Sequence, residues 1–115
     1  MGAKCLTERY SVEQLQAMLA DKESLSLYPR WENRSAWQQI PDEAKHIAIN
    51  EAEQFLGFDW PALPATLFME YSRNGNRTRY EQPYFVRRKA LAALAAAECL
   101  EGKGRFIDDL INGIW

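Results

Sequence analysis

Side chains that ligate metals or form disulfides are scarce in this chain of 115 residues. It contains one histidine, His46, and two cysteines, Cys5 and Cys99, which stand far apart. No CxxC motif or Cys/His cluster is present, and no Ser/His/Asp arrangement is built around His46. We therefore expect no metal, no cofactor and a structural role for His46. Reduced thiols are favoured, with one Cys5–Cys99 disulfide as the alternative.

Long apolar runs and a strong excess of one charge are also absent. The longest apolar run covers only residues 90–97, whereas a bilayer-spanning helix needs about 20 residues. The N-terminus has no apolar segment typical of a signal peptide, which favours a cytoplasmic location; a periplasmic or secreted location is the alternative if a signal was removed. A formal net charge of −2 argues against a uniformly basic nucleic-acid-binding protein. We expect neither a membrane nor nucleic acid as a partner.

What the chain does contain is the apolar periodicity of helices. Hydrophobic residues make up 47% of the sequence, enough to build one globular domain over residues 1–115. They recur at three- and four-residue spacing, and no strand-like alternation occurs. The fold class predicted is all-α, with about five helices arranged as antiparallel helical hairpins. The helices are expected at residues 12–21, 41–56, 63–73, 83–101 and 105–114, with a helical turn near residue 35 in an otherwise irregular segment from residue 23 to residue 39.

Local signals define the boundaries of these helices. Ser11 and Gln14 have the spacing of a capping box at a helix start. Pro83 is interpreted as the residue that opens the fourth and longest helix. The triplet Asn74-Gly75-Asn76 predicts a turn, since Asn and Gly tolerate positive φ. The apolar stripe of the last helix continues to Trp115, which we interpret as a chain cut inside a larger fold.

Basic side chains concentrate between residues 73 and 89, which we call the basic segment. It contains six basic side chains against Glu81 alone: Arg73, Arg77, Arg79, Arg87, Arg88 and Lys89. Tyrosines and asparagines are interleaved with them. Arginine pairs bidentately with carboxylate or sulfate, and aromatic faces stack on sugar rings, so the basic segment suits an anionic, hydroxyl-rich ligand. The alternative is that these side chains pair with carboxylates of neighbouring helices, namely Glu51, Glu53, Glu70 or Glu98.

Four strings in the second half of the chain are distinctive when taken together: Tyr71-Ser72-Arg73-Asn74-Gly75-Asn76-Arg77-Thr78-Arg79-Tyr80-Glu81, then Tyr84-Phe85-Val86-Arg87-Arg88, then Ala97-Glu98-Cys99-Leu100-Glu101-Gly102-Lys103-Gly104-Arg105-Phe106-Ile107-Asp108-Asp109, and finally Asn112-Gly113-Ile114-Trp115. Together they resemble the N-terminal part of heparinase II/III-like proteins, which are relatives of bacterial polysaccharide lyases. The resemblance is firmest over residues 60–115. It implies that the helices begin an incomplete α/α toroid and that the chain is the N-terminal fragment of a longer protein.

The resemblance also implies a function. Members of this family cleave uronate-containing glycans by β-elimination, and their catalytic groups lie in segments beyond Trp115, so no catalytic residue is assigned and the chain alone is expected to be inactive. Asn76, Arg77, Tyr80 and Arg88 match positions of the shared segment. We expect them to line the binding cleft for an acidic polysaccharide or oligosaccharide.

An alternative interpretation of the sequence does not involve a glycan ligand. In this alternative the chain is a non-catalytic helical module that binds a partner protein or forms a homo-oligomer through its alanine-rich and isoleucine-rich faces. Self-association through apolar helix faces is expected under either reading.

Overall fold

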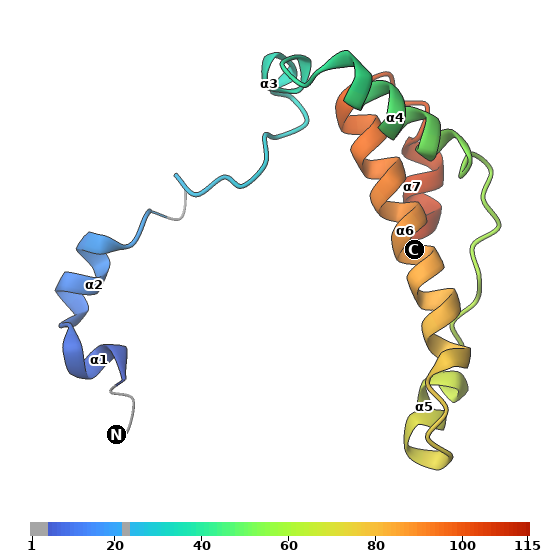
Figure 1. The fold of residues 1–115 in the computed structure, drawn as a ribbon, viewed down its shortest axis with the longest axis horizontal. Coiled ribbons are helices and arrows are strands. Elements are labelled where there is room, and N and C mark those ends of the chain that lie inside the picture. The colour runs from blue at the N-terminus through green and yellow to red at the C-terminus, as the bar shows by residue number, and fades with distance from the viewer. Residues whose placement is uncertain (1–4, 22–23) are drawn as a thin grey trace. The chain divides into compact units, whose positions relative to one another are not determined.

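The computed structural model describes residues 5–21 and 24–115, and all its regular elements are helices (Figure 1). No strand occurs within those ranges, which confirms the all-α class. The chain divides into two compact units, one ending at Arg30 and one covering Trp31–Trp115. The prediction of a single domain stays a prediction. In chain order, the helices are α1 (Leu6–Arg9), α2 (Val12–Met18), α3 (Arg34–Gln38), α4 (Asp42–Glu53), α5 (Ala65–Arg73), α6 (Thr78–Glu101) and α7 (Ile107–Ile114).

The first unit is held by local contacts. The predicted capping box is present: the Ser11 hydroxyl accepts the Gln14 N–H at 3.2 Å, and the Gln14 side chain accepts the Ser11 N–H at 2.9 Å. Helix α2 has no buried residue and ends at Met18, earlier than the predicted Asp21. A helix this short gains little without tertiary packing, and Leu19 is already extended. Helix α1 was not predicted, and Glu23 lies outside the described residues.

The second unit has its core where α4 and α7 pack against the C-terminal half of α6 (Figure 1). The fully buried residues are small except for Leu94 and Phe106; the others are Ala52, Ala90 and Ala97. Alanine lets helix axes approach closely, so α4 lies against α6 with little side-chain width between them. Helix α3 supplies the helical turn expected near residue 35. Helix α5 contacts the other, N-terminal end of α6.

The prediction that Pro83 opens the longest helix is wrong. Helix α6 begins at Thr78, and Pro83 lies inside it. The start is stabilised elsewhere: the Asn76 side-chain oxygen accepts the Arg79 N–H at 3.2 Å, and the Arg77 carbonyl accepts the N–H groups of Tyr80 and Glu81. Proline lacks an N–H donor, so α6 forgoes one hydrogen bond near its start and continues.

Glycines with positive φ follow the ends of two helices at the predicted places, and the chain turns there. Gly75 follows α5 with a φ of +74°, and Gly102 follows α6 with a φ of +68°, a region that residues with a Cβ rarely adopt. Gly113 lies within α7 against the Trp60 ring, where a Cβ would collide with the indole. Gly113 therefore allows α7 to approach the connector that carries Trp60 closely. None of the helices described is long and apolar enough to cross a membrane.

Candidate functional site

Aromatic rings form a continuous row from α5 into the first half of α6, which we call the aromatic row: Phe68, Tyr71, Tyr80, Tyr84 and Phe85. Phe68 and Tyr71 both contact Tyr80, with ring centroids 5.3 and 5.9 Å apart. Tyr80 stacks on Tyr84 at 5.6 Å, and Tyr84 meets Phe85 edge-on at 5.2 Å. Tyr80 and Tyr84 are four residues apart, so one helix face carries both. Phe68 and Phe85 are exposed, so the row presents apolar ring surface to solvent.

An arginine stands at each end of the aromatic row. The Arg77 guanidinium lies 5.3 Å from the Tyr71 ring centre and donates from Nε to Glu81 Oε1 at 3.1 Å. The Arg88 guanidinium lies 5.4 Å from the Tyr84 ring and donates to the Tyr84 hydroxyl at 3.0 Å. Eleven residues of α-helix correspond to about 16 Å along the axis. Two cations therefore bracket the rings of α6.

The hydroxyl of Tyr71 is not placed to act as a base. It donates a hydrogen bond to Glu81 Oε1 at 3.3 Å. Burial raises the pKa of the Tyr71 hydroxyl above its usual value, and the neighbouring Glu81 carboxylate raises it further. Tyr71 therefore stays protonated at neutral pH and serves as a donor and a packing group.

The structure places three of the four predicted binding residues on one surface. Tyr80 and Arg88 lie along α6 with Tyr84 between them, and Arg77 is the N-cap residue immediately before the helix. Asn76 has a different position, since its side-chain oxygen caps the start of α6 and its N–H donates to Asn74 Oδ1 at 2.8 Å. Asn76 thus shapes the turn that leads into the row.

Some side chains of the basic segment pair with carboxylates, which is the alternative to ligand binding. Arg79 pairs with Glu70 at 2.6 Å and Lys89 with Glu51 at 3.3 Å, as that alternative expected. Arg77 pairs instead with Glu81, next to it on α6.

The other two expected carboxylates act outside the basic segment. Glu53 binds Arg105 at 2.7 Å, and Glu98 accepts the Gly104 N–H at 2.8 Å. Within the described part of the chain, no carboxylate lies within 4 Å of the guanidinium groups of Arg87 or Arg88.

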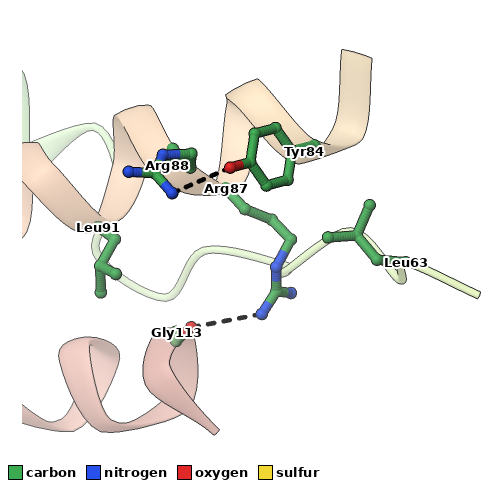
Figure 2. A pocket seen from close by; sticks show the side chains of 6 residues that line it. All are labelled: Leu63, Tyr84, Arg87, Arg88, Leu91 and Gly113. Atoms are coloured by element: carbon green, nitrogen blue, oxygen red, sulfur yellow. Dashed lines mark hydrogen bonds between the residues drawn. The ribbon is translucent and has the colours of Figure 1, made fainter. Parts of the chain in front are cut away.

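Arg87 and Arg88 line a small cavity of about 120 Å³ between α6, α7 and the connector before α5 (Figure 2). Leu63, Tyr84, Leu91 and Gly113 complete its lining. Figure 2 shows the Arg87 side chain reaching from α6 to Gly113, with Leu63 and Leu91 on either side of it. Arg87 donates to the carbonyls of Pro61 at 3.0 Å and Gly113 at 3.3 Å.

This cavity was not predicted from the sequence. Arg87 was noted only as part of the basic segment, and its two carbonyl partners lie 26 residues away on either side. The adjacent arginines were the signal available, but no local pattern identifies Pro61 or Gly113 as their neighbours.

A second, mainly apolar surface, which we call the apolar face, lies along α6 and α7. Two hollows of about 350 and 310 Å³ lie on it, lined mainly by Trp31, Leu91, Ala92, Ala95, Cys99, Ile107 and Leu110, and Arg88 borders the second hollow. Ile111 and Ile114 extend the stripe along α7, with 57% and 74% of their surface exposed. Partial burial raises the pKa of the Cys99 thiol, so the group is a weak nucleophile at neutral pH.

The residues that the structure describes include no candidate metal site. They contain no group of three or more His, Cys, Asp or Glu side chains that could hold a metal ion. His46 is exposed on α4. No protein-family model matches the chain, and no curated protein matches it either.

Proposed function

We propose that the second unit binds an acidic, uronate-containing glycan along the aromatic row, as the N-terminal helical segment of a heparinase II/III-like polysaccharide lyase. The observation that carries the proposal is Arg88, whose guanidinium lies on the Tyr84 ring with no described carboxylate in reach. The remaining N–H groups of Arg88 suit a carboxylate or sulfate of a ligand. The family assignment rests on the four sequence strings within residues 71–115.

The row offers the two kinds of contact that an acidic sugar chain needs. Exposed ring faces such as those of Phe68 and Phe85 provide apolar area for sugar rings. Arg77 and Arg88 provide charge at intervals along the same helix, and surface arginines hold anions more specifically than lysines do because their donors form a planar fork. Arg77 forms an ion pair with Glu81, which offsets its charge. Arg88 therefore contributes more than Arg77 to the proposed attraction of an acidic glycan.

The chemistry of β-elimination is not assigned to these residues. Such a reaction needs a base for the C5 proton and a group that neutralises the uronate carboxylate. The Tyr71 hydroxyl has a raised pKa and faces Glu81, so it is a poor base. In this proposal the described helices bind substrate, and the catalytic groups belong to other parts of the parent protein.

The test is retention on immobilised heparan sulfate and on polygalacturonate. Arg88→Ala should lower the affinity about tenfold and elute at lower salt, because it removes a charge-assisted contact. Lys103→Ala is the matched control, since it also removes one exposed charge but lies outside the row. Equal retention of Arg88→Ala and the wild type, with both proteins folded by circular dichroism, contradicts the proposal.

The alternative function, a helical interaction module, is favoured by one observation. The stripe of Ile107, Ile111 and Ile114 on α7 is exposed together with the hollows of the apolar face. Exposed apolar patches of this kind mark protein–protein contacts. This alternative requires association through α7, whereas glycan binding along the aromatic row does not.

A further inference from the structure

The turn between α5 and α6 contains an Asn-Gly pair, Asn74-Gly75, and a second pair, Asn112-Gly113, lies in α7 (Figure 1). An asparagine that precedes a glycine can react with its own backbone. The nitrogen of the glycine attacks the carbon of the side-chain amide, and glycine has no Cβ to hinder the approach. The two pairs are equivalent in sequence, but the structure gives them different surroundings.

Asn74 and Gly75 have space and freedom to react. Both are exposed, and a Cβ at Gly75 would meet nothing within 4 Å, so a ring can form at this turn without a clash. The Gly75 N–H donates to the Glu70 carbonyl at 3.0 Å, and the Asn74 N–H donates to the same carbonyl at 3.0 Å. Gly75 can therefore release its hydrogen bond without leaving that carbonyl unpaired when Asn74 rotates from its observed ψ of 2°.

The side-chain amide of Asn74 is also polarised toward attack. Its Oδ1 accepts the Asn76 N–H at 2.8 Å. Negative charge develops on this oxygen when a nucleophile adds to Cγ, and a positioned N–H donor stabilises such charge. The turn thus supplies the nucleophile from Gly75 and a donor for the developing oxyanion from Asn76.

The second pair is protected by the packing of α7. Gly113 lies within the helix, where its N–H points along the axis toward the carbonyl one turn earlier. A Cβ at Gly113 would collide with the Trp60 ring, and the Gly113 carbonyl accepts from Arg87 at 3.3 Å. Reaction of Asn112 would require the end of α7 to open, which costs free energy that an exposed turn does not require.

We propose that Asn74 is a site of spontaneous deamidation, through attack of the Gly75 nitrogen on Asn74 Cγ. Hydroxide removes the Gly75 N–H proton, and the nitrogen forms a bond to Cγ. The Cγ–Nδ2 bond breaks, Nδ2 takes a proton from water and leaves as ammonia, and hydroxide is regenerated. Water then opens the resulting succinimide at either carbonyl, which gives aspartate or isoaspartate. One water is consumed and one ammonia released, so no other reactant is needed.

The two products differ in their effect on α6. Aspartate at position 74 keeps an acceptor for the Asn76 N–H, whereas isoaspartate takes the main chain through the former side chain and adds one methylene to it. The Asn76 Oδ1 caps α6 by accepting the Arg79 N–H at 3.2 Å. Isoaspartate should displace this cap and loosen the first turn of α6. This proposal does not depend on the proposed glycan binding.

The experiment incubates the full chain at mildly alkaline pH and then cleaves it after glutamate at mildly acidic pH, which slows further reaction. Cleavage after Glu70 and Glu81 gives the peptide 71–81, and cleavage after Glu101 releases 102–115. Peptide 71–81 should gain the mass of an NH₂-to-OH replacement and accept label from an isoaspartyl methyltransferase. Its reaction should be about tenfold or more faster than that of peptide 102–115, which α7 protects. In chain unfolded by urea the two rates should become similar.

Two variants assign the reaction and its consequence. Asn74→Gln should remove the mass gain from peptide 71–81, because the larger ring that glutamine must close forms slowly. Asn74→Asp adds the charge without the methylene and is the matched control for structure. Hydrogen exchange at the Arg79 N–H should be faster in the isoaspartyl form than in Asn74→Asp.

Specific results would overturn the proposal. In the folded wild type, a rate at peptide 71–81 no greater than that at peptide 102–115 shows that the turn does not favour the reaction. A mass gain that persists in Asn74→Gln assigns the reaction to Asn76 instead. Equal exchange at Arg79 in the isoaspartyl form and in Asn74→Asp contradicts the expected loosening of α6.

Discussion

Glu98 shows how a single charged residue is accommodated in the core of the second unit. Its side chain is buried, with 4% of its surface exposed. The carboxylate accepts the N–H of Gly104 at 2.8 Å and that of Phe106 at 3.4 Å. These backbone donors precede α7 and have no partner within that helix. Glu98 is therefore a structural anion that joins the end of α6 to the start of α7.

Replacing Glu98 should destabilise the protein. Glu98→Ala leaves buried N–H groups without an acceptor and is expected to cost about 2 kcal/mol in the free energy of unfolding. Urea denaturation followed by circular dichroism measures it. Asp108→Ala, an exposed acid on α7, is the control and should cost much less. A loss for Glu98→Ala no greater than that control is the result that contradicts this role.

At the scale of the elements, the C-terminal end of α6 depends on a glycine and an arginine from another helix. Gly102 follows the helix in the left-handed conformation. The Arg34 guanidinium, from α3, donates to the carbonyls of Cys99 at 2.8 Å and Leu100 at 3.2 Å. Those carbonyls belong to the last turn of α6 and lack an intrahelical donor. A cation at a helix C-terminus also interacts favourably with the helix dipole.

Two glycines with similar φ angles allow this end to be tested. A Cβ at Gly102 would lie 2.7 Å from Arg34 Cζ, whereas a Cβ at Gly75 meets nothing within 4 Å. Gly75→Ala should therefore cost only the backbone strain of the left-handed region, about 1 kcal/mol. Gly102→Ala should cost more, since Arg34 must also move away from the α6 carbonyls. Unfolding free energies in urea distinguish the two, and equal losses would show that Arg34 contributes nothing there.

At the scale of the whole molecule, the aromatic row and the apolar face of the second unit differ in chemistry. The aromatic row and its two arginines belong to α5 and the first half of α6. The apolar face belongs mainly to the second half of α6 and to α7. The proposed glycan binding and its alternative, association through α7, are therefore expected to be separable by substitution.

Association through the apolar face predicts a concentration-dependent mass. Sedimentation velocity should show the wild type forming dimers or larger species as its concentration rises through the micromolar range, since α7 exposes a stripe of isoleucines. Ile111→Glu should stay monomeric, because association would bury its charge. Ile47→Glu, an exposed position on α4, is the control and should behave as the wild type does. A wild type that remains monomeric throughout this range argues against self-association through the apolar face.

Features determined by neighbouring residues could be predicted from the sequence alone. The helical class follows from apolar spacing, and the Ser11–Gln14 capping box forms because its two partners are three residues apart. The turn at Gly75 and the end of α6 at Gly102 follow from the conformational freedom of glycine. The start of α6 is predicted too late because the Asn76 side chain caps the helix upstream of Pro83, and the helix continues through the proline.

Tertiary structure alone decided which charges are paired and which surfaces are open. Arg79 and Lys89 meet carboxylates on other helices, whereas the partners of Arg87 among the described residues are two carbonyls and a ring. All three were equivalent in the sequence as members of the basic segment. The spacing of a residue in the sequence determines its helix face. Its partner on another helix depends on how the helices pack. That packing depends in turn on small uncharged residues such as Gly113 and Ala97.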